Sequence, residues 1–241
     1  MIKIIFFSAS LFITSNLFAQ GILSTVGGKI YLGASAGISF PLSSFADDNP
    51  QSSSSGYAKT GYLIELTGGV RFLNLFELSV AGFRNSNSTD VTNLASSFSS
   101  SIPDITFTGQ SGSWEIYGLL FGIGISFPMP QKFIADVLVL GGYQNTSSPE
   151  ITLTGDVQDA YVKIEGQTVS SPVYLASVSA RYPISTSLYL SFGFQYIASS
   201  AKFDNVKTTT SVDGETDEST ISFSRDLDAW GLNVGLKYFI L

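Results

Sequence analysis

Six charged residues interrupt apolar segments of this chain and could form ion pairs with one another. Charged residues make up only 13% of the sequence. The six lie at alternate positions of otherwise apolar segments: Glu65, Arg71, Glu77, Asp136, Arg181 and Lys237. Three are acidic and three are basic, so the set is formally neutral. Arg71 and Glu77 flank Leu73-Asn74 at similar distances, and a tight turn at that dipeptide would bring the two side chains together.

The residues that most catalytic and metal-binding sites use are absent from this sequence. The chain contains no histidine and no cysteine, so it has no disulfide, no lipoprotein acylation site and no transition-metal ligand set. We expect no metal and no cofactor. A Ser-Lys or paired-carboxylate site stays open on spacing alone. A solvated loop is the simpler interpretation of the most concentrated acids in the middle of the chain, Glu150, Asp156, Asp159 and Glu165.

The segments that carry the six charges alternate between apolar and polar residues. From Tyr62 to Phe72 one set of alternate positions is apolar, while the other set carries Glu65, Thr67 and Arg71. Period-two alternation predicts β-strands with one apolar and one polar face. A soluble β-sandwich would alternate as well, so alternation alone does not separate it from a membrane barrel.

Aromatic residues bracket several of these apolar faces. The two aromatic residues of each pair are eight to ten positions apart, and a tilted strand of about 9 to 11 residues spans a bilayer. This placement is typical of interfacial aromatic girdles. The predicted girdle consists of Tyr62, Phe72, Tyr174, Tyr182, Trp230 and Tyr238.

Eight such segments follow one another, separated alternately by short turns and long Ser/Asp-rich loops. The sequence therefore predicts an all-β protein, an eight-stranded antiparallel up-and-down transmembrane β-barrel, with both termini at the short-turn end. The predicted strands cover residues 30–41, 60–72, 75–85, 114–127, 132–145, 172–183, 188–199 and 228–241.

The first residues predict export. Lys3 precedes an apolar stretch from Ile4 to Phe18 that ends at Ala19-Gln20, as in a cleaved signal peptide. A single membrane helix is the alternative, but the stretch is short and interrupted by polar residues. We expect a signal peptide over residues 1–19 and a barrel domain over 20–241, placed in the bacterial outer membrane.

The first and last strands carry a family resemblance. The Gly/Ala-rich segment 31–42 and the C-terminal segment 233–240 are similar to those of the small OmpA-type and OmpX-type outer-membrane barrels. The resemblance implies that Asn233, Gly235, Tyr238 and Ile240 form the signal read by the outer-membrane insertion machinery. It also implies no enzymatic activity, because the barrel enzymes of this membrane rely on a catalytic histidine.

An eight-stranded barrel encloses a lumen only just wide enough for side chains, and the six charged residues point into it. Two interpretations remain open. A static ion-pair network would stabilise a closed plug, because an unpaired charge in such a lumen costs several kcal/mol. A rearranging network would act as the gate of a narrow ion or small-solute channel.

The long loops predict a role at the cell surface. Residues 204–228 hold seven acidic and two basic residues, a formal charge of −5. The acids could bind divalent cations that bridge lipopolysaccharide, could bind a basic extracellular protein, or could serve solubility alone. Alternation in 151–154, 161–164 and 221–224 predicts strands that continue beyond the bilayer and offer edges for β-augmentation. We interpret the serine runs 52–55 and 96–101 as flexible.

We expect outer-membrane lipid and lipopolysaccharide to surround the barrel. The expected partners are the outer-membrane insertion machinery and an extracellular protein ligand. We expect the protein to be a monomer. Nucleic acid is not expected as a partner, because the net charge is −7 and no basic stripe is present. The main predicted function is a structural or adhesive surface role.

Overall fold

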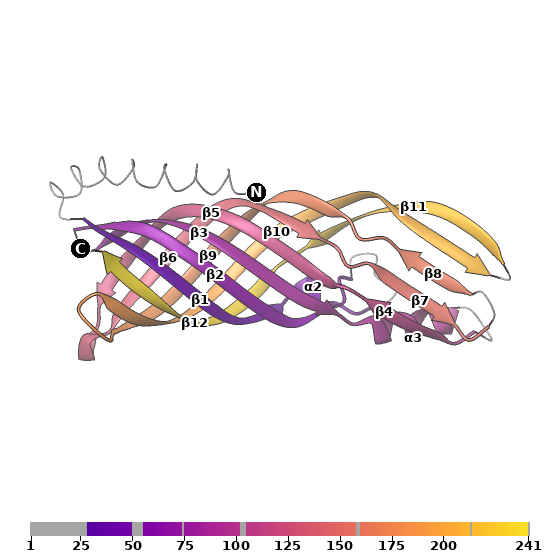
Figure 1. Cartoon of the computed structure of the whole chain (residues 1–241), viewed down its shortest axis with the longest axis horizontal. Coiled ribbons are helices and arrows are strands. Elements are labelled where there is room, and N and C mark those ends of the chain that lie inside the picture. The colour runs from indigo at the N-terminus through magenta and orange to yellow at the C-terminus, as the bar shows by residue number, and fades with distance from the viewer. Residues whose placement is uncertain are drawn as a thin grey trace, which may run out of the picture.

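Eight long antiparallel strands close into a barrel (Figure 1). The structure is a computed structural model, and its described residues are 28–49, 55–73, 75–101, 105–157, 160–212 and 214–240. The expected signal peptide over residues 1–19 lies outside them. Within the described ranges, no helix has the length and apolar character needed to cross a membrane.

The ring of eight strands closes because the last strand pairs with the first. Ile30 lies opposite Ile240, and Pro41 lies opposite Ala229. The ring strands, in order, are β1 (Lys29–Pro41), β2 (Ala58–Phe72), β3 (Phe76–Thr89), β5 (Ser113–Pro128), β6 (Ile134–Ser147), β9 (Thr168–Pro183), β10 (Leu188–Val212) and β12 (Ala229–Ile240). The predicted all-β, eight-stranded antiparallel barrel is confirmed.

Strand ends differ from the prediction mainly at the loop end of the barrel. β3 runs four residues past its predicted end at residue 85, and β10 continues from its predicted end at 199 to Val212. At the other end the connections are short, and one holds the 3-10 turn η1 (Pro130–Lys132). Because Ile30 pairs with Ile240, β1 begins and β12 ends at this short-turn end.

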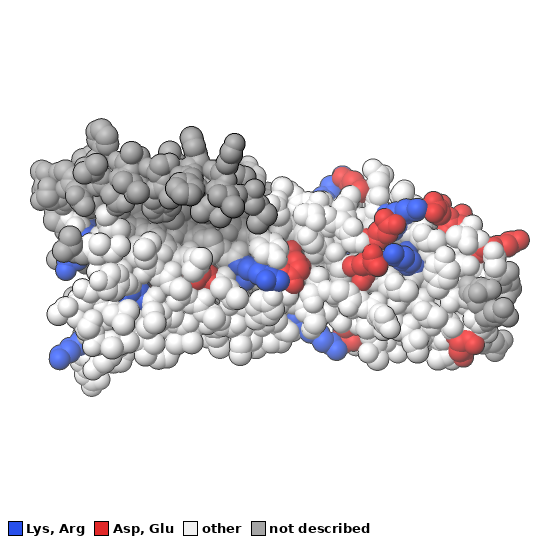
Figure 2. Space-filling model, in the orientation of Figure 1, with Lys and Arg blue, Asp and Glu red and all other residues white. Residues whose placement is uncertain are grey.

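The outer wall of the barrel is apolar over most of its height. Alternation turns every second side chain outward, and Leu66, Leu119, Phe121, Ile123 and Val139 are each more than half exposed. On the face seen in Figure 2, charged side chains gather over the loop half and are sparse on the barrel wall. Soluble monomers rarely expose apolar surface on this scale, whereas a barrel that spans a bilayer must.

Beyond the ring, a second sheet continues from β10. Its strand order is β11–β10–β8–β7–β4, and its β7, β8 and β11 contain the three continuations predicted from alternation, which are confirmed. Its additional strands are β4 (Phe107–Ser111), β7 (Ile151–Gly155), β8 (Tyr161–Ile164) and β11 (Glu215–Asp226). Together with helix α3 (Val91–Ser101), this sheet forms what we call the loop module. A short helix, α2 (Ser43–Ala46), lies in the first long loop.

Helix α3 corrects the interpretation of residues 96–101 as flexible, because these serines belong to the helix. Its apolar residues Leu94, Ala95 and Phe98 pack on the sheet residues Phe107 and Leu153. The serine hydroxyls donate to backbone carbonyls one turn earlier, as in Ser96 to Thr92 O at 2.9 Å. Packing of one apolar stripe therefore outweighs the weak helix propensity of serine.

The other serine run lies mostly outside the described residues, since only Ser55 of 52–55 is described. Ser55 is buried, and its hydroxyl oxygen lies 2.7 Å from Asp47 Oδ2 and 2.7 Å from the Asn49 carbonyl oxygen, which share its single proton as acceptors. At this residue the interpretation as flexible is wrong, because the side chain is buried and hydrogen-bonded.

Candidate functional site

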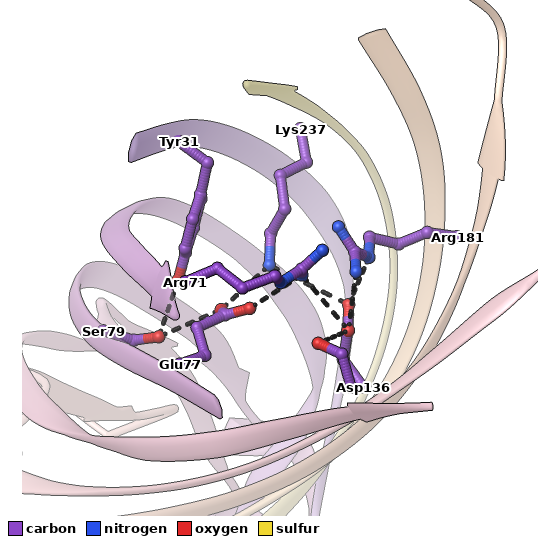
Figure 3. Close-up of polar contacts among 8 residues, drawn as sticks. Tyr31, Arg71, Glu77, Ser79, Asp136, Arg181 and Lys237 are labelled. Carbon is purple, nitrogen blue, oxygen red and sulfur yellow. Dashed lines mark hydrogen bonds and ion pairs between the residues drawn. The ribbon is translucent and has the colours of Figure 1, made fainter. Parts of the chain in front are cut away.

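Five charged side chains meet in the lumen (Figure 3). They come from five strands and lie near the short-turn end of each. Arg71 Nη2 lies 3.0 Å from Glu77 Oε2, and Lys237 Nζ lies 3.1 Å from Glu77 Oε1. Asp136 is the second acid of this charged cluster: its Oδ1 accepts from Arg181 Nη2 at 2.9 Å and lies 3.6 Å from Arg71 Nη2. Two carboxylates are thus shared among three cations.

Every member of the charged cluster is at least nine-tenths buried. Desolvating an ion costs several kcal/mol, and only close pairing offsets that cost. Removing one carboxylate would leave buried cations without compensation, so the five side chains depend on one another for stability.

Hydroxyl groups that we did not predict complete the hydrogen bonds of the two acids. Ser79 Oγ lies 3.1 Å from Glu77 Oε1 and 2.6 Å from the Tyr31 hydroxyl. Ser126 Oγ donates to Asp136 Oδ1 at 2.7 Å. Strand alternation places all three on the lumen face and could have identified them.

An aromatic ring closes the cluster toward the short-turn end. The Arg71 guanidinium lies 4.7 Å and the Arg181 guanidinium 5.2 Å from the centre of the Phe239 ring. Tyr31 and Tyr189 pack on the same ring, with centroids 5.6 and 5.3 Å away. Such cation–π and aromatic contacts add stability where solvent is excluded. Sequence reasoning missed Phe239, although its position in β12 faces the lumen.

Glu65 stands apart from the cluster. Among the described residues it forms none of the ion pairs within 4 Å. It lines a cavity of about 60 Å³ together with Lys237, Gln195 and Asn233. A cavity of this size and polarity can hold a few waters, so hydration can compensate the Glu65 carboxyl.

Above this cavity the lumen is filled by apolar side chains. We call this set the apolar layer; it comprises Leu63, Phe83, Leu120, Leu140, Leu175 and Ile197, all buried. Packed aliphatic and aromatic groups exclude water and ions. The lumen is therefore charged toward the short turns and apolar in this layer, and the buried polar side chains Asn85, Gln144 and Thr146 lie farther toward the loops. Alternation alone does not reveal this order along the barrel.

The six predicted girdle residues lie on the outer wall. Tyr62, Tyr174, Tyr182, Trp230 and Tyr238 are each at least 37% exposed, and Phe72 is half-buried beside Phe76 and Leu78. Trp230 stacks on Phe194 with ring centroids 4.5 Å apart.

The residues of the expected insertion signal divide between the two faces of β12. Tyr238 and Ile240 point outward and are about half exposed. Asn233 points into the lumen, where its Nδ2 donates to Gln195 Oε1 at 2.9 Å. At Gly235 a Cβ atom would approach the Ala34 carbonyl to 2.4 Å, so this position requires glycine for close strand packing.

Acidic side chains of the loop module lie on its surface. Glu215, Asp217 and Glu218 are exposed on β11, whereas Asp213 lies outside the described residues. Glu218 binds Lys207 at 2.8 Å, and this hydrogen bond raises the pKa of Lys207. No group of three acidic, histidine or cysteine side chains in the described ranges could hold a metal ion.

The acidic residues of segment 150–165 lie in the third long loop. This agrees with the interpretation of the segment as a loop surface. Glu150 binds Lys163 at 3.3 Å, and Asp156 Oδ1 accepts from the Thr106 amide at 2.9 Å. Asp159 is outside the described residues, and Glu165 directly follows β8. Both contacts link loop segments to each other, and neither pairs two carboxylates.

An ion pair also fixes the base of the module. Lys59 Nζ lies 2.9 Å from Asp90 Oδ2, just before α3. Burial pushes the pKa of Asp90 upward, but hydrogen bonds from Lys59 and from the Asn93 amide outweigh it and hold that pKa below its ordinary value.

No protein-family model and no curated protein matches this chain. Its neighbours among solved structures include small outer-membrane β-barrels. A major outer membrane protein of Thermus thermophilus is 13% identical, with a TM-score of 0.47 over 88% of this chain and 99% of that chain. Neisserial surface protein A is 13% identical, with a TM-score of 0.42 over 87% and 96%. Ail of Yersinia pestis is 9% identical, with a TM-score of 0.38 over 88% and 97%. Identities and scores this low say nothing about the partners of this chain.

Proposed function

We propose that this chain is an integral outer-membrane protein whose barrel anchors a binding surface outside the cell, in a structural or adhesive role. The observation that carries the proposal is the loop module, which has an apolar core of its own around Phe107, Leu153 and Val162. Loops that only connect strands do not need such a core. A folded module of this kind presents a fixed surface to a partner.

The free edge of β11 is the part of this surface best suited to binding. Among the described residues β11 pairs only with β10, and its side chains from Glu215 to Ser222 are exposed. An exposed edge can accept an extended segment of another protein as an added strand. The acidic residues favour a basic protein partner, and divalent cations that bridge lipopolysaccharide are the alternative.

Membrane placement in this proposal rests on the apolar outer wall and on the predicted signal peptide. A chain delivered from the periplasm leaves both termini at the short-turn end, where β1 begins and β12 ends. The module then faces outward from the cell. We propose a monomer that binds no nucleic acid and catalyses no reaction, since the acids of the charged cluster are committed to ion pairs.

The test removes the β10–β11 extension and keeps the ring. Residues 204–222 are replaced by Asn-Gly, a two-residue turn that joins Phe203 to Phe223, which already lie opposite each other. Proteoliposomes are titrated with a labelled decapeptide of alternating Lys and Val, with its alternately N-methylated form, and with Ca²⁺-loaded lipopolysaccharide vesicles. We expect the intact protein to bind the unmethylated peptide and the shortened variant to lose binding while its gel mobility stays heat-modifiable.

The matched control keeps the hairpin and neutralises it through Glu215→Gln, Asp217→Asn and Glu218→Gln. If this control also loses binding, the acidic charges are required and the strand edge by itself does not hold the peptide. Equal binding of the N-methylated peptide would contradict β-augmentation, and binding of lipopolysaccharide vesicles alone would favour the cation-bridging alternative. Equal binding of every probe by the shortened variant would overturn the surface role.

A narrow gated channel is the second candidate. The observation that favours it is the charged cluster, which lies between the 60 Å³ cavity and a cavity of about 240 Å³ lined by Lys29, Arg71 and Phe239. Conduction would also require the apolar layer to open. Single-channel recording of the refolded protein tests this candidate: discrete openings that Glu77→Ala or Arg71→Ala alters would place it first.

A further inference from the structure

The cavity of about 240 Å³ beside the charged cluster is a vestibule at the short-turn end of the lumen. Its polar lining includes Lys29 from β1, Arg71 from β2, Tyr189 from β10 and Thr186 from the turn that precedes β10. The first and last parts of the chain both contribute, so the vestibule exists only when the ring is closed. None of its described lining residues is acidic.

The vestibule presents donors that the fold itself does not use. Lys29 lies directly opposite Arg71 in the register of β1 and β2, and like charges in opposite positions repel each other. Lys29 is exposed and forms none of the ion pairs within 4 Å among the described residues. Within the same ranges, the hydroxyl groups of Thr186 and Tyr189 form no hydrogen bond either. A cation and two hydroxyls are therefore free to bind a ligand.

The charges behind the vestibule leave it positive. The charged cluster holds three cations and two carboxylates, and Lys29 adds a fourth cation without adding an acid. Arg71 approaches both carboxylates with the same atom, Nη2, at 3.0 and 3.6 Å. Its Nε is buried and has no hydrogen-bond partner. Glu65 lies on the far side of the cluster, in the cavity of about 60 Å³, and balances the excess only in part.

These features select for an anion with several oxygens. A positive ligand would be repelled, and a neutral ligand would gain nothing from the excess charge. Two cations and two hydroxyls match the charge and the oxygen atoms of a phosphate dianion. At roughly 10–15 Å³ of cavity per water-sized group, the vestibule has room for about 16–24 such groups. This is more than bare phosphate fills and is enough for a phosphate ester with a small substituent.

We propose that the vestibule binds a phosphate monoester. The phosphate accepts hydrogen bonds from Lys29 Nζ and from the hydroxyls of Tyr189 and Thr186, while Arg71 adds positive charge from behind. The substituent lies against the apolar wall formed by Pro128 and Ile134. Two sources share this chemistry: a soluble phosphate ester, or the headgroup of phosphatidic acid in the adjoining lipid leaflet. The lipid source rests on the proposed membrane placement, and neither source involves the loop module at the other end of the barrel.

The experiment titrates the mature protein in phosphatidylcholine nanodiscs by isothermal calorimetry. The probes have similar size and differ in charge: glycerol 3-phosphate is the anion, glycerol is neutral, and serinol is the cation. We expect saturable binding of glycerol 3-phosphate to one site, weakened by added salt because ions screen the attraction. We expect no saturable binding of glycerol or serinol.

Variants assign the binding to the vestibule. Lys29→Gln should weaken binding of glycerol 3-phosphate about tenfold, since a hydrogen bond to a charged group is lost. The matched control is Lys132→Gln, which changes another exposed lysine at the same end that does not line the vestibule, and should leave binding within about twofold. Tyr189→Phe keeps the ring that packs on Phe239 but removes the hydroxyl, and should weaken binding about threefold. Heat-modifiable gel mobility confirms that each variant is folded.

The lipid composition distinguishes the two sources. Part of the phosphatidylcholine is replaced by phosphatidic acid or, at equal membrane charge, by phosphatidylglycerol. If phosphatidic acid weakens binding of glycerol 3-phosphate more than phosphatidylglycerol does, and Lys29→Gln removes this difference, the lipid headgroup occupies the vestibule. Equal effects of the two lipids assign the site to the soluble ester. Absence of saturable binding, equal affinities for glycerol and glycerol 3-phosphate, or equal losses in Lys29→Gln and Lys132→Gln would overturn the proposal.

Discussion

Arg71 and Glu77 face each other across the turn between β2 and β3, with Arg71 Nη2 3.0 Å from Glu77 Oε2. The other oxygen of Glu77 lies 3.1 Å from Nζ of Lys237, which is 160 positions further along the chain. A local hairpin therefore supplies one cation, and closure of the ring between β12 and β1 supplies the other. The charged cluster is complete only in the closed barrel.

Neutralising the shared acid should destabilise the barrel strongly. Glu77→Gln leaves the buried Arg71 and Lys237 without a full counter-charge, and such a loss costs about 3–5 kcal/mol. We expect that decrease in the free energy of unfolding, measured by urea titration in lipid vesicles. Glu65→Gln is the control, with an expected change of about 0.5 kcal/mol, because Glu65 forms no ion pair with the described residues. Equal losses in both variants would contradict the assigned role of the cluster.

The apolar layer should be the barrier to ion flow. Leu120→Ser combined with Leu140→Ser introduces hydroxyls and space where the lumen is dry, so we expect measurable conductance in planar bilayers. Leu119→Ser changes a neighbouring leucine that is 64% exposed on the outer wall and should leave the bilayer silent. If the double variant stays closed while Glu77→Ala conducts, the charged cluster and not the apolar layer is the barrier.

Helix α3 should detach from the module when its main sheet contact is removed. Phe107 packs on Phe98 with centroids 6.2 Å apart, and truncating a buried phenylalanine costs about 3–5 kcal/mol. In Phe107→Ala we expect faster hydrogen exchange across residues 91–101 and unchanged exchange in β5 and β6. Thr108→Ala, at the exposed neighbouring position, should change neither. Faster exchange throughout the barrel would show that the module and the ring unfold together.

Acid should loosen the base of the module through Asp90. The pKa of this carboxyl is lower in the folded protein than its ordinary value of about 4, so its ionised form stabilises the fold above that pH. The contribution is lost as the pH falls through the lower folded value. We expect the hydrogen-exchange protection factors of residues 90–101, which correct for the slower intrinsic exchange in acid, to be lower at about pH 3 than at pH 6 relative to those of the barrel strands. Asp90→Asn should remove this difference, and a difference that persists in Asp90→Asn would assign it to another group.

The ring of strands can be predicted from the sequence. Period-two alternation assigns each side chain to a face, and the face without charged residues points outward while the face that carries the six charged residues points inward. The alternation of short and long connections then specifies that neighbouring strands pair in chain order and that both termini lie at the short-turn end of the barrel. For these reasons the predicted strand positions agree with β1 to β12 within a few residues at most ends.

The contents of the lumen at each height and of the loops depend on tertiary packing. Alternation specifies the face of a side chain but not its height, which depends on strand tilt and on the register around the ring. The sequence therefore did not reveal that Leu63 and Leu120 meet in one dry layer while Glu77 and Lys237 meet in another. The loops depended even more on packing: Ser96 to Ser100 adopt a helix because Leu94 and Phe98 find Phe107 and Leu153. Contacts between residues far apart in the chain supplied the energy for these features, and no local pattern records them.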